Sequence, residues 1–427
     1  MFSENQVGGP MYEPENVDWD ALGLRVSNVF TPSAPINSEE LFRGRTGQVR
    51  EVVDAINQPG RHAILFGGRG VGKTSLGRIL PQKLRAIDPV PVVAPFVTCD
   101  SSDTYASIWR KAFIEMRDLS RDTLSDDDDP DPIEVMNTDW TPYEVRRSLE
   151  RFATKGLLYV VIDEFDKIED PDCRQLMADT IKLLSDHAVQ ATLVIIGVSD
   201  DATGLIDDHR SIERCLAQIS MPRMPREESE SIITRGLERL GMKIDTVALH
   251  EIVGLCKGLP TYAHVLGLHS ARAAVDGRRL NVTVPDVETA INRAISHSEE
   301  TIREEYDKAT YSPRKTIYPQ VLLACAMAQN DEYGRFQPND LCEPMRIITG
   351  QAYRTDGFTV HLKAFCTDAR GFVLKMSGAE YRRRYQFRNP LLQPYVLMKG
   401  LSARLVSEDD LKLGPPDDDL PLFPPQR

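Results

Sequence analysis

Residues 62–74 read HAILFGGRGVGKT, and this stretch decides the fold. HAILF is a short apolar strand candidate, and TSLGRILPQKL after the glycines begins a helix. A G-x-x-x-x-G-K-[ST] pattern between a strand and a helix is the context in which a loop binds phosphate groups. The sequence therefore predicts a strand–loop–helix unit that holds a nucleoside triphosphate.

Each part of this loop has a physical role. Glycines let successive backbone N–H groups converge on phosphate oxygens, and the helix amino terminus adds a favourable dipole. Lys73 neutralises charge on the β- and γ-phosphates, and Thr74 supplies an oxygen to Mg²⁺. The expected cofactors are therefore ATP and Mg²⁺. The predicted nucleotide-binding residues of the loop are Gly67, Gly68, Arg69, Gly70, Val71, Gly72, Lys73, Thr74 and Ser75, and Lys73 is also predicted to be catalytic.

An acidic motif follows ninety residues after the lysine, in the strand-like run LLYVVIDEFD at 157–166. Asp163 at the carboxyl end of a strand can hold Mg²⁺, and Glu164 can orient and polarise the attacking water. This pair predicts hydrolysis, whereas Asp166 is expected to be structural. The alternative interpretation is a solvated strand end that takes no part in chemistry.

Two further apolar runs, at 90–100 and 191–200, read as strands, and 105–119 reads as an amphipathic helix. The runs at 157–166 and 191–200 are almost continuously apolar, which is typical of parallel strands buried on both faces. Because helix-like segments separate the strands, the predicted fold class is α/β with a doubly wound parallel sheet. The acidic run SDDDDPDP at 125–132 cannot enter a core and is expected to be a solvated loop.

Composition sets the broad class of the protein. The chain has 427 residues, more than one ordinary core holds, and its seven scattered cysteines show no spacing typical of zinc or of a redox pair. No apolar run reaches eighteen residues, and the amino terminus lacks the basic and apolar parts of a secretory signal. We therefore expect no membrane partner and a cytoplasmic location.

The phosphate loop, the Asp163–Glu164 pair and the later strand VIIGVSD resemble the Walker A, Walker B and sensor 1 elements of AAA+ and STAND ATPases. The resemblance covers residues 40–300 and extends to origin-recognition initiators. It implies a P-loop ATPase core and places Ser199 or Asp200 beside the γ-phosphate, although the usual asparagine is absent.

The run HRSIERCLAQISMPRM resembles the arginine-finger segment of clamp loaders and origin-recognition initiators, where an Arg-Cys pair precedes a short strand. The matching residue is Arg214, with Arg210 in reserve. An arginine there reaches a neighbouring subunit's γ-phosphate, so the resemblance implies a homo-oligomer and a catalytic role for Arg214. The alternative is a surface salt bridge.

Two shorter segments resemble other parts of these ATPases. FRGR at 42–45 resembles the F-x-G-R entry of origin-recognition and STAND ATPases, which assigns Phe42 and Arg45 to the adenine pocket. GLPTYAHVLG at 258–267 resembles the Gly-x-Pro element of STAND lids. His264 within it either faces the nucleotide or is simply packed.

Residues 315–398 resemble the winged-helix domain that follows the lid in initiators and STAND proteins. Residues 301–400 hold fifteen Lys and Arg against ten Asp and Glu, a net charge of +5, whereas the whole chain carries −13. Four arginines alternate with aromatic residues there, and they either contact the phosphate backbone of DNA or pair with the acidic ATPase core. The cluster comprises Arg382, Arg383, Arg384 and Arg388, with Tyr381, Tyr385 and Phe387.

These segments predict five parts along the chain. The ATPase core carries the parallel sheet, a helical lid follows it, and the winged-helix-like domain is C-terminal. The expected bounds are 1–37 for an extended N-terminal arm, 38–222 for the P-loop core, 223–310 for the lid, 311–402 for the winged-helix-like domain, and 403–427 for an acidic, Pro-rich disordered tail.

One function hypothesis and two alternatives follow. The first is an ATP-binding and ATP-hydrolysing AAA+/STAND switch that oligomerises with ATP and acts on an effector protein, or on DNA through residues 311–400. One alternative is a DNA-binding ATPase of initiator or transposition-regulator type with little turnover. The other is an antiviral, host-defence signalling ATPase that recruits an effector. DNA-stimulated ATPase activity with salt-sensitive retention on duplex favours the DNA-binding alternative.

Overall fold

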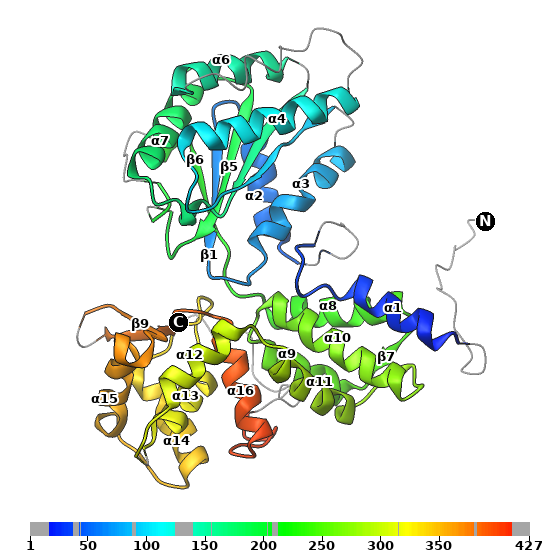
Figure 1. Ribbon diagram of the computed structural model, residues 1–427, viewed down its shortest axis with the longest axis vertical. Coiled ribbons are helices and arrows are strands. Elements are labelled where there is room, and N and C mark those ends of the chain that lie inside the picture. The colour runs from blue at the N-terminus through cyan, green and yellow to red at the C-terminus, as the bar shows by residue number, and fades with distance from the viewer. Residues whose placement is uncertain are drawn as a thin grey trace, which may run out of the picture. The chain divides into compact units, whose positions relative to one another are not determined.

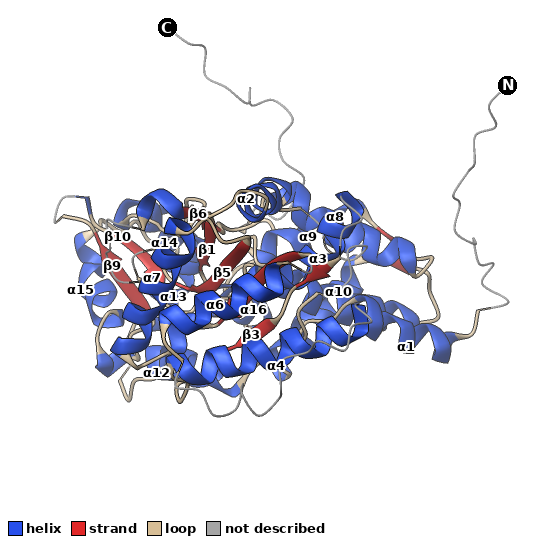
Figure 2. Ribbon diagram, turned by 90° about the horizontal axis from the view of Figure 1, so that it is seen from above, coloured by secondary structure: helices blue, strands red, loops and turns tan. Residues whose placement is uncertain are grey.

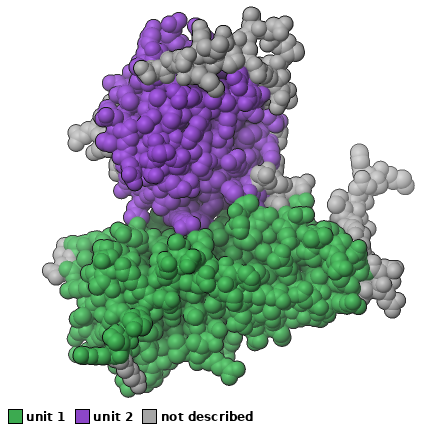
Figure 3. Space-filling model, viewed as in Figure 1, with its two compact units in different colours: residues 1–34, 223–427 green, residues 35–222 purple. Residues whose placement is uncertain are grey.

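The computed structural model describes residues 17–36, 42, 44–87, 91–123, 140–154, 156–202, 204–206, 212–314, 316–379 and 382–411. The predicted loop at 125–132 lies outside these residues, as do Arg43, Arg210 and Tyr381. The chain divides into two compact units (Figure 3). One is Pro35–Pro222, and the other combines Met1–Ala34 with Arg223–Arg427.

The unit Pro35–Pro222 is built on a sheet in which every strand pair is parallel. The strand order is β2-β4-β5-β1-β6, and β3 also pairs with β4. The run predicted as one strand at 90–100 is broken at Pro95, which has no N–H to donate to a neighbouring strand. The predicted parallel α/β sheet is confirmed. Its strands are β1 (His62–Gly67), β2 (Val92–Val93), β3 (Phe96–Thr98), β4 (Leu157–Asp163), β5 (Ala191–Val198) and β6 (Leu216–Ser220).

Helices cover both faces of this sheet, because its strands bury alternate side chains on opposite sides (Figure 1). Val160 and Ile162 of β4 join the core formed with α4, α6 and α7. Val161 faces α3 instead, and a Cβ at Gly77 of α3 would lie only 3.4 Å from it. The helices of this unit are α2 (Thr46–Ile56), α3 (Lys73–Ile87), α4 (Tyr105–Thr123), α6 (Pro142–Ala153) and α7 (Pro171–Asp186).

The strand order brings the carboxyl ends of β4, β5 and β1 together, because these strands are parallel neighbours. They end at Asp163, Val198 and Gly67. The short helix η3 (Glu213–Cys215) precedes β6, so Arg214 lies at the opposite, amino-terminal edge of the same sheet. One edge therefore gathers the predicted phosphate loop and acidic pair, and the other carries the predicted arginine finger.

The first part of the other unit is a helical bundle with one small strand pair. β7 (Lys243–Ile244) and β8 (Asn281–Val282) pair in parallel, so the lid predicted to be helical also contains a short strand pair. Strands of two residues are too short to show a period in the sequence. The helices are α8 (Arg226–Arg239), α9 (Thr246–Cys256), α10 (Pro260–Asp276) and α11 (Val284–Ser296).

The extended arm predicted for the amino terminus is wrong over its described part, which forms helix α1 (Trp19–Val29). Asp18 begins this helix, because its carboxylate accepts a backbone N–H from the first turn at 2.9 Å. Leu22, Val26 and Phe30 follow at four-residue spacing, and all three are buried. This spacing is the sequence signal that predicts a helix here.

In the remainder of this unit, three helices and a strand hairpin follow in winged-helix order, with one further helix before them and one after them. β9 and β10 pair antiparallel, and a bridge between Phe336 and Tyr385 adds a third short segment. Figure 2 shows the hairpin beside α15. The winged-helix-like fold is therefore confirmed. Its elements are α12 (Glu300–Thr310), α13 (Tyr318–Met327), α14 (Cys342–Thr349), α15 (Asp356–Phe365), β9 (Leu374–Ser377), β10 (Arg384–Phe387) and α16 (Leu392–Ser402).

The tail predicted to be disordered from residue 403 is structured at its beginning. Val406 is buried, and the Ser407 N–H donates to the Asp410 carboxylate at 2.8 Å in a capped turn. The sequence predicted disorder here because the Pro and Asp residues that follow position 406 dominate the composition of this segment. Residues 412–427 lie outside the described part of the chain.

Glu251 on α9 is the least expected buried charge of this unit. It is 1% exposed, and in the described structure neither carboxyl oxygen has a hydrogen-bond partner. Burial, followed by the charges of Glu408 and Glu288, raises its pKa from 4.5 to about 7. The unfolded chain therefore ionises at lower pH than the folded one. The buried Glu251 carboxyl therefore lowers the stability of the folded state progressively as pH rises from 4.5, and this destabilisation reaches its maximum above about pH 7.

We expect Glu251→Gln to stabilise the protein by roughly 2 kcal/mol at about pH 8 and to change little near pH 4. Urea unfolding at both pH values measures this. The control is Glu408→Gln, because Glu408 is exposed and its neutralisation should have a much smaller effect. Parallel stability profiles for wild type and Glu251→Gln between these pH values would show that Glu251 is not the group responsible.

Candidate nucleotide-binding site

The phosphate loop begins where β1 ends, and its first residue has to be glycine. Gly67 has φ +150°, and a Cβ there would lie 2.4 Å from the Met221 carbonyl oxygen. Gly70 and Gly72 have φ values of +80° and +96°, which L side chains rarely adopt. The chain therefore curls tightly between β1 and α3, as a loop whose N–H groups converge on an anion must do.

Lys73, the first residue of α3, points back into this curl. Its Nζ donates to the carbonyl oxygens of Gly67 at 2.9 Å and Gly68 at 2.8 Å. Burial lowers the pKa of Lys73 to about 8, while the charges of Asp166, Asp163 and Glu164 oppose that shift. The ammonium is thus held at the loop, close to three carboxylates.

Asp163 and Thr74 face each other across the ends of β4 and α3. Burial raises the pKa of Asp163, which is 3% exposed, and a hydrogen bond from the Thr74 side chain opposes that shift. The Glu164 N–H also donates to Asp163 Oδ1 at 2.9 Å. A hydroxyl and a carboxylate are the oxygen donors that Mg²⁺ takes from proteins. The two side chains therefore fit the metal role predicted for them.

Glu164 differs from its neighbour in access to water. It has φ +57°, a left-handed conformation that is uncommon outside glycine and that ends β4 and begins η2 (Phe165–Lys167). Its carboxylate accepts from Lys167 Nζ at 2.6 Å, and both side chains are at least 40% exposed. The buried Asp163 carboxylate is therefore suited to bind a metal ion, and the accessible Glu164 carboxylate is suited to bind a water molecule.

Asp166 holds the neighbouring strand end. Its Oδ1 accepts the Val198 N–H at 2.7 Å, which ties η2 to the last residue of β5. This contact gives Asp166 the structural role predicted for it. Its charge is also the largest of those that favour protonated Lys73, an effect that sequence reasoning missed. The one sequence signal for this charge effect is that Asp166 lies close to the Asp163–Glu164 pair in the chain.

Ser199 and Asp200, the sensor 1 candidates, directly follow β5 at the edge that carries the loop. Ser199 Oγ accepts the Asp201 N–H at 3.4 Å, and Asp200 is exposed. The sheet order thus brings both residues to the strand end between β1 and β4.

Ser75 and Arg45 contact backbone groups. Ser75 Oγ accepts the Ile36 N–H at 3.0 Å. Arg45 is 3% exposed, and its guanidinium donates to the carbonyl oxygens of Val71 and Pro222. Phe42 is half-buried. The structure therefore places Arg45 against the backbone of the phosphate loop.

Arg214 and His264 do not join the other predicted residues. Arg214 is 75% exposed and forms an ion pair with Asp186 at 2.8 Å, at the amino-terminal edge of the sheet. His264 accepts the Thr31 N–H at 3.3 Å and packs edge-on against Phe30. Burial lowers the pKa of His264 to about 4, so it is a neutral, packed histidine. Of its two predicted roles, packing is the one observed.

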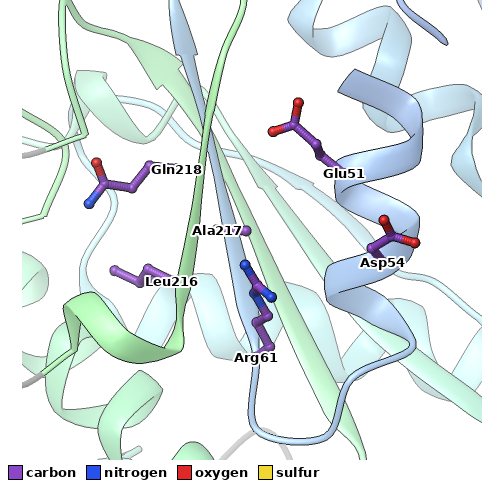
Figure 4. A pocket seen from close by; sticks show the side chains of 6 residues that line it. All are labelled: Glu51, Asp54, Arg61, Leu216, Ala217 and Gln218. Carbon is purple, nitrogen blue, oxygen red and sulfur yellow. The ribbon is translucent and has the colours of Figure 1, made fainter. Parts of the chain in front are cut away.

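A cavity of about 390 Å³ lies at the edge strand β6, and no sequence pattern predicts it. Figure 4 shows its side chains coming from α2 and β6, with Arg61 between them. It shares no residue with the phosphate loop and is not the nucleotide site. Its lining consists of Glu51, Asp54, Arg61, Leu216, Ala217 and Gln218.

Comparison with known protein families assigns the chain to one of them. The family model described as novel STAND NTPase 1 matches residues 35–336, which include the whole arrangement above. The chain belongs to this family of STAND NTPases. The resemblance to AAA+ and STAND P-loop ATPases is thereby confirmed. Within the described residues of this STAND NTPase, no helix is long and apolar enough to cross a membrane.

The chain is also similar to solved structures, and the first of them supports the same fold. The Walker-type ATPase of Pyrococcus abyssi is 15% identical, with a TM-score of 0.52, over 85% of this chain and 98% of that one. The Aeropyrum pernix Orc1 protein in complex with DNA is 17% identical with a TM-score of 0.45, over 88% and 97%. Cdc6p from Pyrobaculum aerophilum is 15% identical with a TM-score of 0.43, over 89% and 99%. No curated protein sequence matches this STAND NTPase.

Replacing the loop lysine tests this site directly. We expect Lys73→Ala to lower ATP affinity roughly 100-fold or more, because a charge-assisted contact to phosphate is lost. Titration with a fluorescent ATP analogue measures the affinity, and thermal unfolding checks that the variant is folded. Wild-type affinity in a folded Lys73→Ala protein would exclude this loop as the phosphate site.

Proposed function

We propose that this STAND NTPase binds ATP with Mg²⁺, hydrolyses it, and uses the cycle as a switch that assembles subunits and acts on a partner. The observation that carries the proposal is the convergence of Lys73, Thr74, Asp163 and Glu164 at one edge of the sheet. All seven cysteines are free thiols, which supports a reducing, cytoplasmic location.

The proposed chemistry follows from these side chains. Lys73 exchanges the carbonyls of Gly67 and Gly68 for phosphate oxygens, and the loop N–H groups take the remaining phosphate contacts. Thr74 and Asp163 are the residues that would hold Mg²⁺, which would neutralise charge on the phosphates. Glu164, the accessible carboxylate, orients the attacking water and accepts its proton.

The position of Arg214 supports action on a neighbouring subunit. It lies at the amino-terminal edge of a sheet whose carboxyl edge carries the loop, so it cannot reach the phosphates of its own chain. Its ion pair with Asp186 is exposed and contributes little, about 0–1 kcal/mol, so it gives way readily to a phosphate. We therefore propose a homo-oligomer in which Arg214 completes the next site.

The winged-helix surface favours a protein partner over base-stacking contacts with DNA. Tyr385 and Phe387 are buried, and Arg384 forms an ion pair with Asp331 at 3.0 Å. In contrast, Val360 on α15 is 70% exposed and Met376 on β9 is 46% exposed. Tyr385 and Phe387 are therefore not available to stack on DNA bases, whereas the exposed apolar side chains support recruitment of an effector, as in the defence-signalling alternative.

Removing the general base should separate binding from turnover. We expect Glu164→Gln to bind ATP like wild type and to hydrolyse it on the order of 100-fold more slowly, because an amide cannot take the proton from water. Phosphate release and nucleotide titration measure the two properties. The exposed Glu169 supplies the matched control, since Glu169→Gln should hydrolyse ATP normally. Wild-type turnover by Glu164→Gln would remove Glu164 from the mechanism.

A mixing experiment tests the arginine finger. We expect Arg214→Ala to bind ATP normally and to lose at least about 100-fold in hydrolysis, because the transition-state contact comes from another subunit. Mixing it with Lys73→Ala should restore activity, since an intact pocket then meets an intact arginine. Asp186→Ala removes the same ion pair but keeps the arginine, so it should remain active. Equal losses in Arg214→Ala and Asp186→Ala, without rescue on mixing, would mean that the ion pair is only structural.

A further inference from the structure

Arg45 has an unusual backbone for a residue with a long side chain. It has φ +60° and follows Gly44 at φ +73°, so two successive residues are left-handed just before α2 begins. A left-handed backbone is unfavourable for a non-glycine residue and persists where its surroundings hold it in place. The turn directs the guanidinium into the protein, where the residue is 3% exposed.

The contacts of Arg45 join two segments of backbone. Its guanidinium donates to the Val71 carbonyl at 3.2 Å, in the middle of the phosphate loop, and to the Pro222 carbonyl. Pro222 follows Met221. The Met221 N–H donates to the Phe66 carbonyl oxygen at 2.8 Å, and the Met221 carbonyl lies against Gly67. The loop is thereby fixed at its first residue by packing and at its centre by Arg45.

We propose that Arg45 is a positioning residue for nucleotide binding: it holds the Val71 carbonyl outward so that the loop N–H groups face the phosphates. This inference rests on the proposed function and differs from the adenine-lining role implied by the family resemblance. A carbonyl turned towards the bound anion would repel it, whereas one held by a buried guanidinium cannot turn. Arg45 thus acts through the backbone without touching the nucleotide.

The two roles predict different dependence on the ligand. A residue that lines adenine affects ATP, ADP and adenosine alike, and alters the preference for ATP over GTP. A residue that positions the loop affects only ligands with phosphates and leaves the base preference unchanged. Lysine keeps the charge but is shorter and lacks the planar fork, so Arg45→Lys separates charge from geometry.

Hydrogen exchange of the nucleotide-free protein tests the positioning role without relying on ATP binding. We expect Arg45→Ala to speed exchange in residues 67–76 at least roughly tenfold, because the loop loses its central tether. The control is Arg61→Ala, an exposed arginine near the start of β1 that bonds Gln58, which should leave that segment unchanged. Wild-type exchange at residues 67–76 in folded Arg45→Ala and Arg45→Lys proteins would overturn the proposal.

Affinity measurements complete the test. We expect ATP and ADP to bind roughly 10- to 100-fold more weakly to both Arg45 variants, with adenosine binding and the ATP-to-GTP ratio unchanged. A loss confined to base discrimination, or full rescue by Arg45→Lys, would overturn the positioning role. If wild-type protein binds no ATP, the proposed function fails, while faster exchange in Arg45→Ala still supports the tether.

Discussion

The buried ammonium of Lys73 is the interaction on which the rest of the site depends. Taking this charge out of water costs several kcal/mol unless hydrogen bonds and opposite charges replace its hydration. Two loop carbonyls accept hydrogen bonds from it, and Asp166, Asp163 and Glu164 favour its charged form. This requires β1 and β4 to end at the same edge of a parallel sheet with only β5 between them. The strand order is therefore a precondition of the chemistry.

The sheet and the loop were predictable because their signals are local and strong. An apolar strand followed by spaced glycines and Lys73 is specific to a phosphate-binding loop. The acidic pair was predictable in the same way, because it lies at the end of an apolar strand, β4. Parallel strands buried on both faces also leave a continuous apolar run that is hard to mistake. The order of the strands, which brings Asp166 near Lys73, could not be predicted from the sequence, because no local pattern records which strands are neighbours.

Other features depend on contacts between residues far apart in the chain. Arg45 precedes Val71 by 26 residues and Pro222 by 177, and neither carbonyl leaves a trace in sequence because every residue has one. Helix α1 was missed for a different reason, since Pro, Asn and Glu around it outweighed the four-residue spacing of Leu22, Val26 and Phe30. Composition describes a segment on average, whereas a few well-spaced apolar residues are enough to bury one face of a helix.

The chain leaves one unit at Pro222 and enters the other at Arg223, one peptide bond later. On the first side, Arg45 binds the Pro222 carbonyl. On the second, the Arg223 N–H donates to the Glu332 carbonyl at 2.8 Å, and its half-buried side chain donates from the guanidinium to the Lys257 carbonyl at 3.2 Å. Each arginine would leave a partly buried carbonyl without this hydrogen bond if it moved, which disfavours that movement. The hydrogen bonds of Arg45 and Arg223 therefore fix the backbone on either side of this one peptide bond, each within its own unit.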